Sequence, residues 1–310
     1  METIKNVIIE TRPMQWVKNL TIFAFLVFSK EFFIKHQFLV VLEAFGIFTL
    51  LTSSIYIIND IIDLPSDKKS PEKKNRPIAS GKLPIPLAVI LGGLFALASF
   101  FLAYTLSEDL LVLCIVYWIL MILYSLYLKN VAIIDALVIA GGFVIRVMAG
   151  AFVINVSNLY SWLVVLTISV SLLLAFGKRR SEITLLGHNR SEQQRKVLSE
   201  YPVELLNSLI SALIASCFLA YVLLTFQMDS TPAGTILQTN FLHLPATLLR
   251  TTHLLKITIP VVFYGLARYL YIIYTKKNAG TPEKVLFKDI PLLTTVLIWI
   301  ILLFTLLYVA

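Results

Sequence analysis

Three aspartates follow a long apolar segment at a spacing that suits one face of a helix. They are Asp60, Asp63 and Asp67, and spacings of three and seven residues bring all three to the same side. Pro65 is expected to break the helix, which leaves Asp67 on the following turn. Three carboxylates on one face repel one another unless a cation lies among them. Their hard oxygen atoms suit Mg²⁺, which prefers a few carboxylates together with the oxygens of a bound diphosphate.

A simpler interpretation of the same residues is a solvated acidic helix end that Lys68 and Lys69 balance. Asp60 and Asp63 follow directly on the apolar residues at 57–58, where removing a charge from water is costly. We therefore favour the metal site over the solvated helix end.

A basic stretch lies just downstream of the aspartates. Lys73 and Arg76 are three residues apart and are expected to hold the phosphate oxygens that the metal leaves uncovered. The small residues at 79–81, Ala-Ser-Gly, let backbone N–H groups approach an anion. Taken alone, this stretch is an ordinary basic loop beside a membrane. Next to the acidic cluster, it predicts half of a phosphate-binding site, with the metal at the aspartates as the other half.

An arginine is expected deep inside another apolar segment. Asp135 and Arg146 are eleven residues apart, which places them about 20° from perfect alignment and about 16 Å apart along one helix face. Gly142 lies between them and allows close approach. An arginine at this depth must face a polar cavity or a partner. A structural salt bridge is the alternative to phosphate recognition, whereas Arg268 lies nearer a helix end and can extend its charge to the interface.

These residues belong to a chain whose main solvent is lipid. Hydrophobic residues make up 58% of 310 positions and charged residues 14%, with a mean hydropathy of +0.85. The fold class expected is all-α integral membrane, because the apolar runs are continuous and long enough to cross about 30 Å of hydrocarbon. A bundle of about nine transmembrane helices is predicted, near 16–33, 38–58, 85–106, 110–128, 131–153, 160–177, 204–226, 258–275 and 290–309.

The basic residues predict the sidedness of the chain. With nine spans, 20 of the 26 Lys and Arg residues fall in loops on the side of the N-terminus and four on the other side. The positive-inside rule then predicts a multi-pass protein of the cell inner membrane, with a cytoplasmic N-terminus and an active site facing the cytoplasm. The net charge of +8 suits anionic lipid or an anionic substrate. Nucleic acid is a poor partner for a chain without a soluble domain.

One membrane domain is expected over 1–310. Its cytoplasmic loops 59–84 and 178–203 are predicted to carry the site, and a long outer loop covers 227–257. The chain shows no internal repeat and is compatible with a homo-oligomer.

The motifs together resemble the UbiA superfamily of intramembrane prenyltransferases. The resemblance rests on the acidic motif, the basic stretch, the nine-span layout and four further segments. These are Arg12-Pro-Met-Gln-Trp-Val-Lys-Asn19, Tyr124-Ser-Leu-Tyr-Leu-Lys129, Gly142-Phe-Val-Ile-Arg146 and Gly177-Lys-Arg-Arg-Ser-Glu182. Within the superfamily the chain is most similar to the decaprenyl-phosphate phosphoribosyltransferases. Many members carry a second aspartate-rich motif after the sixth span, where this chain has Lys178, Arg179 and Glu182 instead. That difference argues against a second aspartate-bound metal.

The resemblance implies Mg²⁺-dependent transfer of a phosphoribosyl group from phosphoribosyl diphosphate (PRPP) to a polyprenyl phosphate. The candidate catalytic residues are Asp60, Asp63 and Asp135, and the candidate metal ligands are Asp60, Asp63 and Asp67. The candidate substrate-binding residues are Lys18, Asn59, Lys73, Arg76, Tyr124, Lys129, Arg146, Lys178, Arg179 and Glu182. Tyr124 and Lys129 are one residue further apart than the superfamily usually has them, which weakens that part of the assignment.

Two other functions remain open at this point. The first is an ordinary prenyltransferase that moves an isoprenyl chain from its diphosphate to an aromatic acceptor, because it shares the acidic motif. The second is a cation transporter that uses the aspartates as its ion site. The position of the aspartates at the membrane boundary, rather than the midplane, and the lack of a repeat argue against the transporter.

Overall fold

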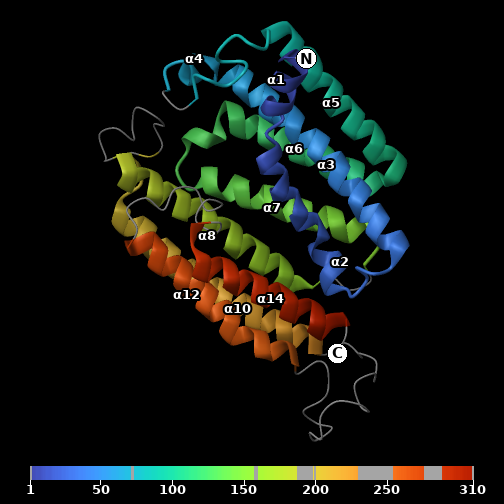
Figure 1. Cartoon of the computed structure of the whole chain (residues 1–310), viewed down its shortest axis with the longest axis vertical. Helices are drawn as coiled ribbons and strands as arrows, with labels where there is room; N and C mark the ends of the chain where they lie inside the picture. Colours follow the sequence, from blue (N-terminus) through green and yellow to red (C-terminus); the bar gives the residue numbers. More distant parts are fainter. Residues whose placement is uncertain are drawn as a thin grey trace, which may run out of the picture. The chain divides into compact units, whose positions relative to one another are not determined.

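A computed structural model describes residues 2–70, 73–156, 160–186, 198, 200–229, 254–275 and 288–308. The described elements are helices joined by turns, which confirms the all-α fold (Figure 1). They gather in two compact units, Met1–Ser157 and Asn158–Ala310. The single membrane domain expected over 1–310 stays a prediction.

The first unit contains the aspartates and most of the candidate site. Its elements in chain order are α1 Glu2–Glu10, the 3-10 helix η1 Pro13–Phe23, α2 Ala24–Phe28, α3 Lys35–Ile62, α4 Leu64–Asp67, α5 Ile85–Leu106, α6 Glu108–Leu126, the 3-10 helix η2 Leu128–Asn130 and α7 Ile134–Val153. In Figure 1, η1 and α2 follow the length of α3, while α5 lies along its other side.

The second unit contains four long helices. They are α8 Ser161–Leu186, α10 Val203–Asp229, α12 Ile259–Thr275, which the 3-10 helix η4 Leu255–Thr258 precedes, and α14 Ile290–Tyr308. The hydroxyls of Ser169 and Ser216, 2.9 Å apart, join α8 to α10. Arg268 of α12 forms two 3.0 Å hydrogen bonds with Asp289, just before α14. Most of the expected outer loop 227–257 lies outside the described residues.

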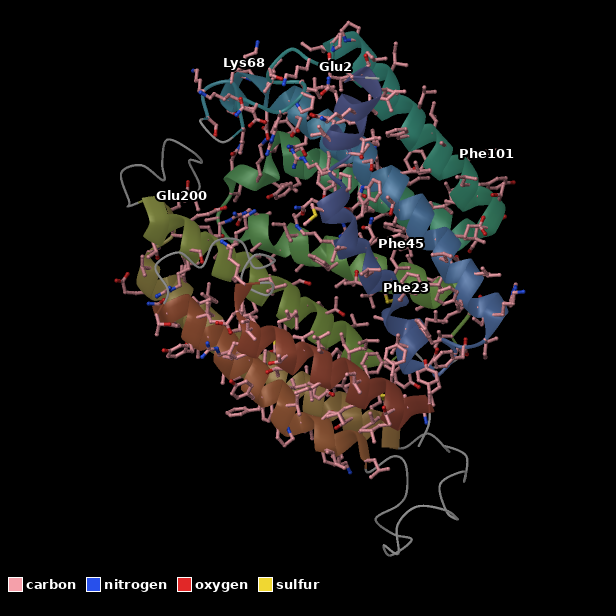
Figure 2. All side chains as sticks on the ribbon, viewed as in Figure 1. Glu2, Phe23, Phe45, Lys68, Phe101 and Glu200 are labelled. Carbon is pink, nitrogen blue, oxygen red and sulfur yellow. The ribbon has the colours of Figure 1, made fainter. Side chains whose placement is uncertain are left out.

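Eight helices in the described part of the chain are long and apolar enough to cross a membrane. They correspond to the second to ninth predicted spans, so these predictions are confirmed in position. Their outward surfaces are apolar, as lipid contact requires. Phe101, for example, has 67% of its surface exposed and projects away from α5 (Figure 2).

The first predicted span, 16–33, is not one α-helix, and this part of the prediction was wrong. The segment is the 3-10 helix η1 followed by the short α2, and the chain turns at Lys30 before α3 begins. Hydropathy measures apolar content and does not distinguish a 3-10 helix from an α-helix. Because a 3-10 helix rises about 2.0 Å per residue, the two elements together extend about 30 Å, close to the thickness of the hydrocarbon layer.

A glycine allows η1 to lie directly against α7. A Cβ atom on Gly150 would come within 1.8 Å of the Ile22 carbonyl oxygen. No side chain fits there, so the backbones touch at this point. The contact holds η1, and with it the turn that precedes η1, against the core of the unit.

Candidate active site

Asp60 lies in the last turn of α3 and is nearly inaccessible, with 2% of its surface exposed. Two guanidinium groups face the same carboxylate oxygen. Arg12 pairs with Oδ1, and Nη1 of Arg76 donates to it over 3.0 Å. Arg12 has a left-handed backbone, with φ of 53°, in the turn between α1 and η1. This turn directs the arginine toward α3, where the guanidinium also lies over the ring of Tyr56, 5.0 Å from its centre.

Arg76 connects two of the three aspartates. Its Nη1 donates to Oδ2 of Asp67 over 2.6 Å as well as to Asp60, and the Lys73 ammonium lies 3.6 Å from the other oxygen of Asp67. The loop that carries these cations is anchored by Ile78 and Leu83, which pack with Ile57 in a buried cluster. Apolar packing therefore places the basic stretch over the end of α3.

Asp63 forms a second arm of the same cluster. It ends α3 as the C-cap residue and pairs with Lys129, which follows α6 in η2. The Asn59 amide donates to its other oxygen over 3.1 Å. α4 begins at the next residue and carries Asp67, so the predicted helix break is confirmed.

The structure thus brings together seven of the predicted residues. They are Asn59, Asp60, Asp63, Asp67, Lys73, Arg76 and Lys129. Sequence reasoning gave no role to two further members, Glu10 and Arg12. Arg12 belongs to the segment before the first span that carried the family resemblance, and that segment was the available signal for it. Burial, and then the neighbouring Asp60 carboxylate, raise the pKa of Glu10 to about 8. Four basic side chains, Arg12, Lys73, Arg76 and Lys129, therefore lie around the three aspartates.

The cluster has oxygen atoms that suit a metal ion. Oδ2 of Asp60 and Oδ1 of Asp67 are buried without a hydrogen-bond partner among the described residues. Buried anionic oxygens of this kind fit a hard cation. Among the same residues, no three acidic, His or Cys side chains lie close enough to hold one ion. The arrangement fits Mg²⁺ bound by one or two carboxylates and completed by substrate oxygens, and the three-aspartate ligand set stays a prediction.

Arg146 lies at a different place in the first unit. Its guanidinium donates to the Asn19 side chain over 2.8 Å, the Gly142 carbonyl over 3.0 Å and the Tyr117 hydroxyl over 2.5 Å. It has 5% of its surface exposed, and all these partners are neutral. The cation also lies 5.2 Å from the centre of the Phe143 ring. The arginine joins η1, α6 and α7, and its predicted contact with phosphate stays a prediction.

Three other candidates in the first unit lie near helix ends. Asp135 is fully buried in the first turn of α7. Tyr124 is half-buried in the last turns of α6, and Lys18 is half-buried in η1. Their roles stay predictions.

The cluster of Lys178, Arg179 and Glu182 belongs to the second unit. Helix α8 continues to Leu186, so these residues lie on a helix and not in the loop expected from 178 onward. Glu182 lies 3.1 Å from Arg179 and 3.9 Å from Lys178, and Arg179 has 2% of its surface exposed. The role of this cluster in the site stays a prediction.

Comparison with known proteins identifies the family. Residues 20–182 match the UbiA prenyltransferase family, a segment that includes the aspartates and the basic stretch. The chain belongs to the UbiA family. It is a membrane transferase.

Two relatives align with most of this UbiA protein. A decaprenyl-phosphate phosphoribosyltransferase of Mycolicibacterium smegmatis is 32% identical over 230 residues, which are 73% of this chain and 72% of the relative. A protein of the same name from Corynebacterium glutamicum is 30% identical over 246 residues, 77% of this chain and 73% of the relative.

Two solved structures have the same fold as this chain. A UbiA homologue from Archaeoglobus fulgidus bound to GPP and Mg²⁺ has a TM-score of 0.68 at 15% identity, over 97% of this chain and 99% of that one. A digeranylgeranylglyceryl phosphate synthase has a TM-score of 0.63 at 16% identity, over 99% and 98%.

Proposed function

We propose that this UbiA protein transfers the 5-phosphoribosyl group of PRPP to a polyprenyl phosphate, with Mg²⁺, at the cytoplasmic face of the membrane. The observation that carries the proposal is the set of four cations, Arg12, Lys73, Arg76 and Lys129, around the three aspartates. Such a site suits two substrates that are both phosphate anions. The names of the relatives that align with most of this chain support the same pair of substrates.

The reaction exchanges one oxygen for another at the ribose C1 atom. The bond from C1 to the diphosphate breaks, the diphosphate leaves with the electron pair, and an acceptor phosphate oxygen forms the new bond. The acceptor is already an anion, so the step needs little help from a general base. When bound at the aspartates, Mg²⁺ would neutralise charge on the leaving diphosphate.

The cations of the site would stabilise the charge that develops on the leaving group. Arg76 offers a planar guanidinium that already joins Asp60 to Asp67, and Lys73 adds a charge beside it. Asp135 is proposed to stabilise positive charge on the ribose. The acceptor phosphate is assigned to some of the four basic residues Lys129, Arg146, Lys178 and Arg179, supported by their charge and by the family resemblance.

An extraction assay tests the proposal. Purified protein is incubated with PRPP labelled in its ribose, Mg²⁺ and polyprenyl phosphates of several lengths, and the label is measured in the organic phase. We expect a labelled lipid that needs both Mg²⁺ and the acceptor. If no chain length yields it, while an isoprenyl diphosphate and an aromatic acceptor yield a prenylated product, the protein is an ordinary prenyltransferase instead.

A single substitution tests the metal role of Asp60. Asp60→Asn keeps the size of the side chain and removes its charge, so turnover should be lost while the protein stays folded in detergent. Near-normal turnover at the same Mg²⁺ concentration would refute this role.

A further inference from the structure

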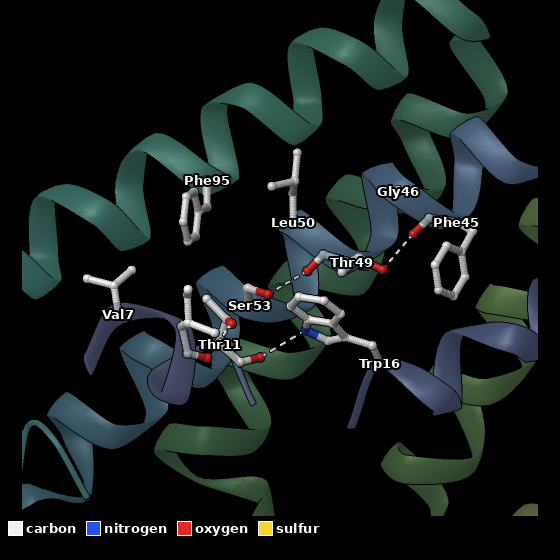
Figure 3. A pocket seen from close by; sticks show the side chains of 10 residues that line it. Val7, Thr11, Trp16, Phe45, Gly46, Thr49, Leu50, Ser53 and Phe95 are labelled. Atoms are coloured by element: carbon white, nitrogen blue, oxygen red, sulfur yellow. Dashed lines mark hydrogen bonds between the residues drawn. The ribbon is translucent and has the colours of Figure 1, made fainter. Parts of the chain in front are cut away.

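An apolar groove lies on the first unit, beside the turn that carries Arg12. Its volume is about 350 Å³. Helix α3 forms its floor, α1 and η1 form one wall, and Phe95 of α5 forms part of the other (Figure 3). The ten lining residues are Val7, Ile8, Thr11, Trp16, Phe45, Gly46, Thr49, Leu50, Ser53 and Phe95.

The polar side chains of the groove are already satisfied. The hydroxyls of Thr11, Thr49 and Ser53 each donate to a carbonyl three or four residues earlier in their own segment, at 2.7–2.8 Å. The Trp16 indole donates to the Thr11 carbonyl over 3.0 Å, as Figure 3 shows. The groove therefore offers no free hydrogen-bond donor to a polar ligand, and its walls suit hydrocarbon.

A cation lies one helical turn from the groove. Lys5 is exposed on α1, three residues before Ile8, and pairs with no acidic residue that the structure describes. Residues three apart on a helix are neighbours on its surface. Ile4 and Ile8 are exposed on the same short helix, with 66% and 52% of their surfaces accessible. An apolar surface with a lysine beside it is typical of a helix at the membrane interface.

We propose that the groove binds one acyl chain of an anionic phospholipid, with the lipid phosphate at Lys5. The apolar walls would hold the chain, and the exposed Lys5 ammonium would favour an anionic headgroup. The groove contacts Thr11 and Trp16, on either side of Arg12. A bound chain would therefore support the turn from which Arg12 reaches Asp60. This lipid is distinct from the substrates proposed above.

A substitution that fills the groove with a side chain tests the proposal. Gly46 has no atom within 4 Å of the position that a Cβ would take, so Gly46→Phe places a ring in open space. Gly93 has equally open surroundings on α5 but does not line the groove, so Gly93→Phe is the matched control. Native mass spectrometry then compares binding of phosphatidylglycerol, phosphatidylcholine with the same chains, and a polyprenyl phosphate.

We expect the unmodified protein and Gly93→Phe to retain one tightly bound phosphatidylglycerol. Gly46→Phe should weaken that binding about tenfold, which corresponds to the loss of two buried methylene groups. Equal binding by Gly46→Phe and Gly93→Phe would overturn the proposal. The proposal would also be overturned if polyprenyl phosphate competed with phosphatidylglycerol and Gly46→Phe weakened the binding of both lipids to the same degree. The groove would then hold the tail of the substrate.

A second variant does not depend on how Gly46→Phe folds. Lys5→Glu changes an exposed side chain on α1, so the core is unaffected. The preference for phosphatidylglycerol over phosphatidylcholine should disappear in this variant. An unchanged preference would contradict the headgroup position.

Discussion

Arg76 is the residue on which the candidate site depends most. One of its nitrogen atoms reaches both Asp60 and Asp67, two carboxylates that are nearly inaccessible to solvent. A lysine carries the same charge on a single nitrogen, so it lacks the planar fork of further N–H groups that a guanidinium can offer to a phosphate. The geometry of this group, as well as its charge, is therefore expected to matter.

Arg76→Lys should lower kcat by about 100-fold, within the range for losing one group that stabilises a transition-state charge. The control is Lys74→Gln, because Lys74 is exposed in the same loop and forms no ion pair with the described residues. Steady-state rates of both variants in the extraction assay check the prediction. Equal rates for Arg76→Lys and the unmodified protein would show that turnover does not need the planar guanidinium of Arg76.

Arg146 illustrates how a buried charge can serve the structure. Its partners Asn19 and Tyr117 come from η1 and α6, and both are neutral. Arg146→Met should destabilise the protein by about 1–3 kcal/mol for each buried partner left without a hydrogen bond. Thermal unfolding in detergent measures this effect. Tyr117→Phe removes one contact and should cost less.

The opposite pattern would favour a direct substrate contact for Arg146. If Arg146→Met unfolds at the unmodified temperature and instead weakens binding of polyprenyl phosphate, the arginine acts on the acceptor. The sequence predicted that this arginine would be buried and functional. Its neutral partners could not be predicted, because Asn19 lies 127 residues away in the chain.

At the scale of elements, the contact between η1 and α7 depends on one glycine. Replacing a helical glycine by alanine normally stabilises a helix by up to about 1 kcal/mol. Gly150→Ala should instead destabilise the protein by about 1–3 kcal/mol, because the new methyl group would overlap the Ile22 carbonyl.

A glycine on the same helix provides the control for this prediction. A Cβ on Gly141 would meet its nearest atom, on Leu120, at 3.7 Å, an ordinary contact. Gly141→Ala should therefore be neutral or stabilising in the same unfolding measurement. Similar unfolding temperatures for the two variants would show that η1 does not depend on this close approach.

The helices themselves were largely predictable, and one element was not. Continuous apolar runs predicted the eight long helices, because lipid requires an apolar surface and paired backbone groups. The 3-10 helix at 13–23 was missed because its composition is that of an α-helical span. Arg12 and Glu10 were missed for a related reason. Their approach to Asp60 depends on the turn between α1 and η1, and local sequence patterns do not specify it.

At the scale of the whole molecule, the basic residues predict which end of each helix faces the cytoplasm. Lys35 and Lys69 lie at opposite ends of the α3–α4 segment, and both are exposed. Lys69→Cys should react with a membrane-impermeant maleimide only in inside-out vesicles, and Lys35→Cys only in right-side-out vesicles. The natural Cys114 and Cys217 are buried, which keeps background labelling low. The reverse pattern would place the site on the outer face.

The group that is transferred determines the mass of the lipid product, so this mass distinguishes phosphoribosyl transfer from other reactions. A reaction with PRPP, Mg²⁺ and a polyprenyl phosphate of one defined length is extracted and analysed by mass spectrometry. We expect a lipid heavier than the acceptor by one phosphoribosyl group, with fragments that contain both the ribose phosphate and the polyprenyl phosphate. An acceptor that stays unmodified, whether or not PRPP is consumed, would contradict this proposal.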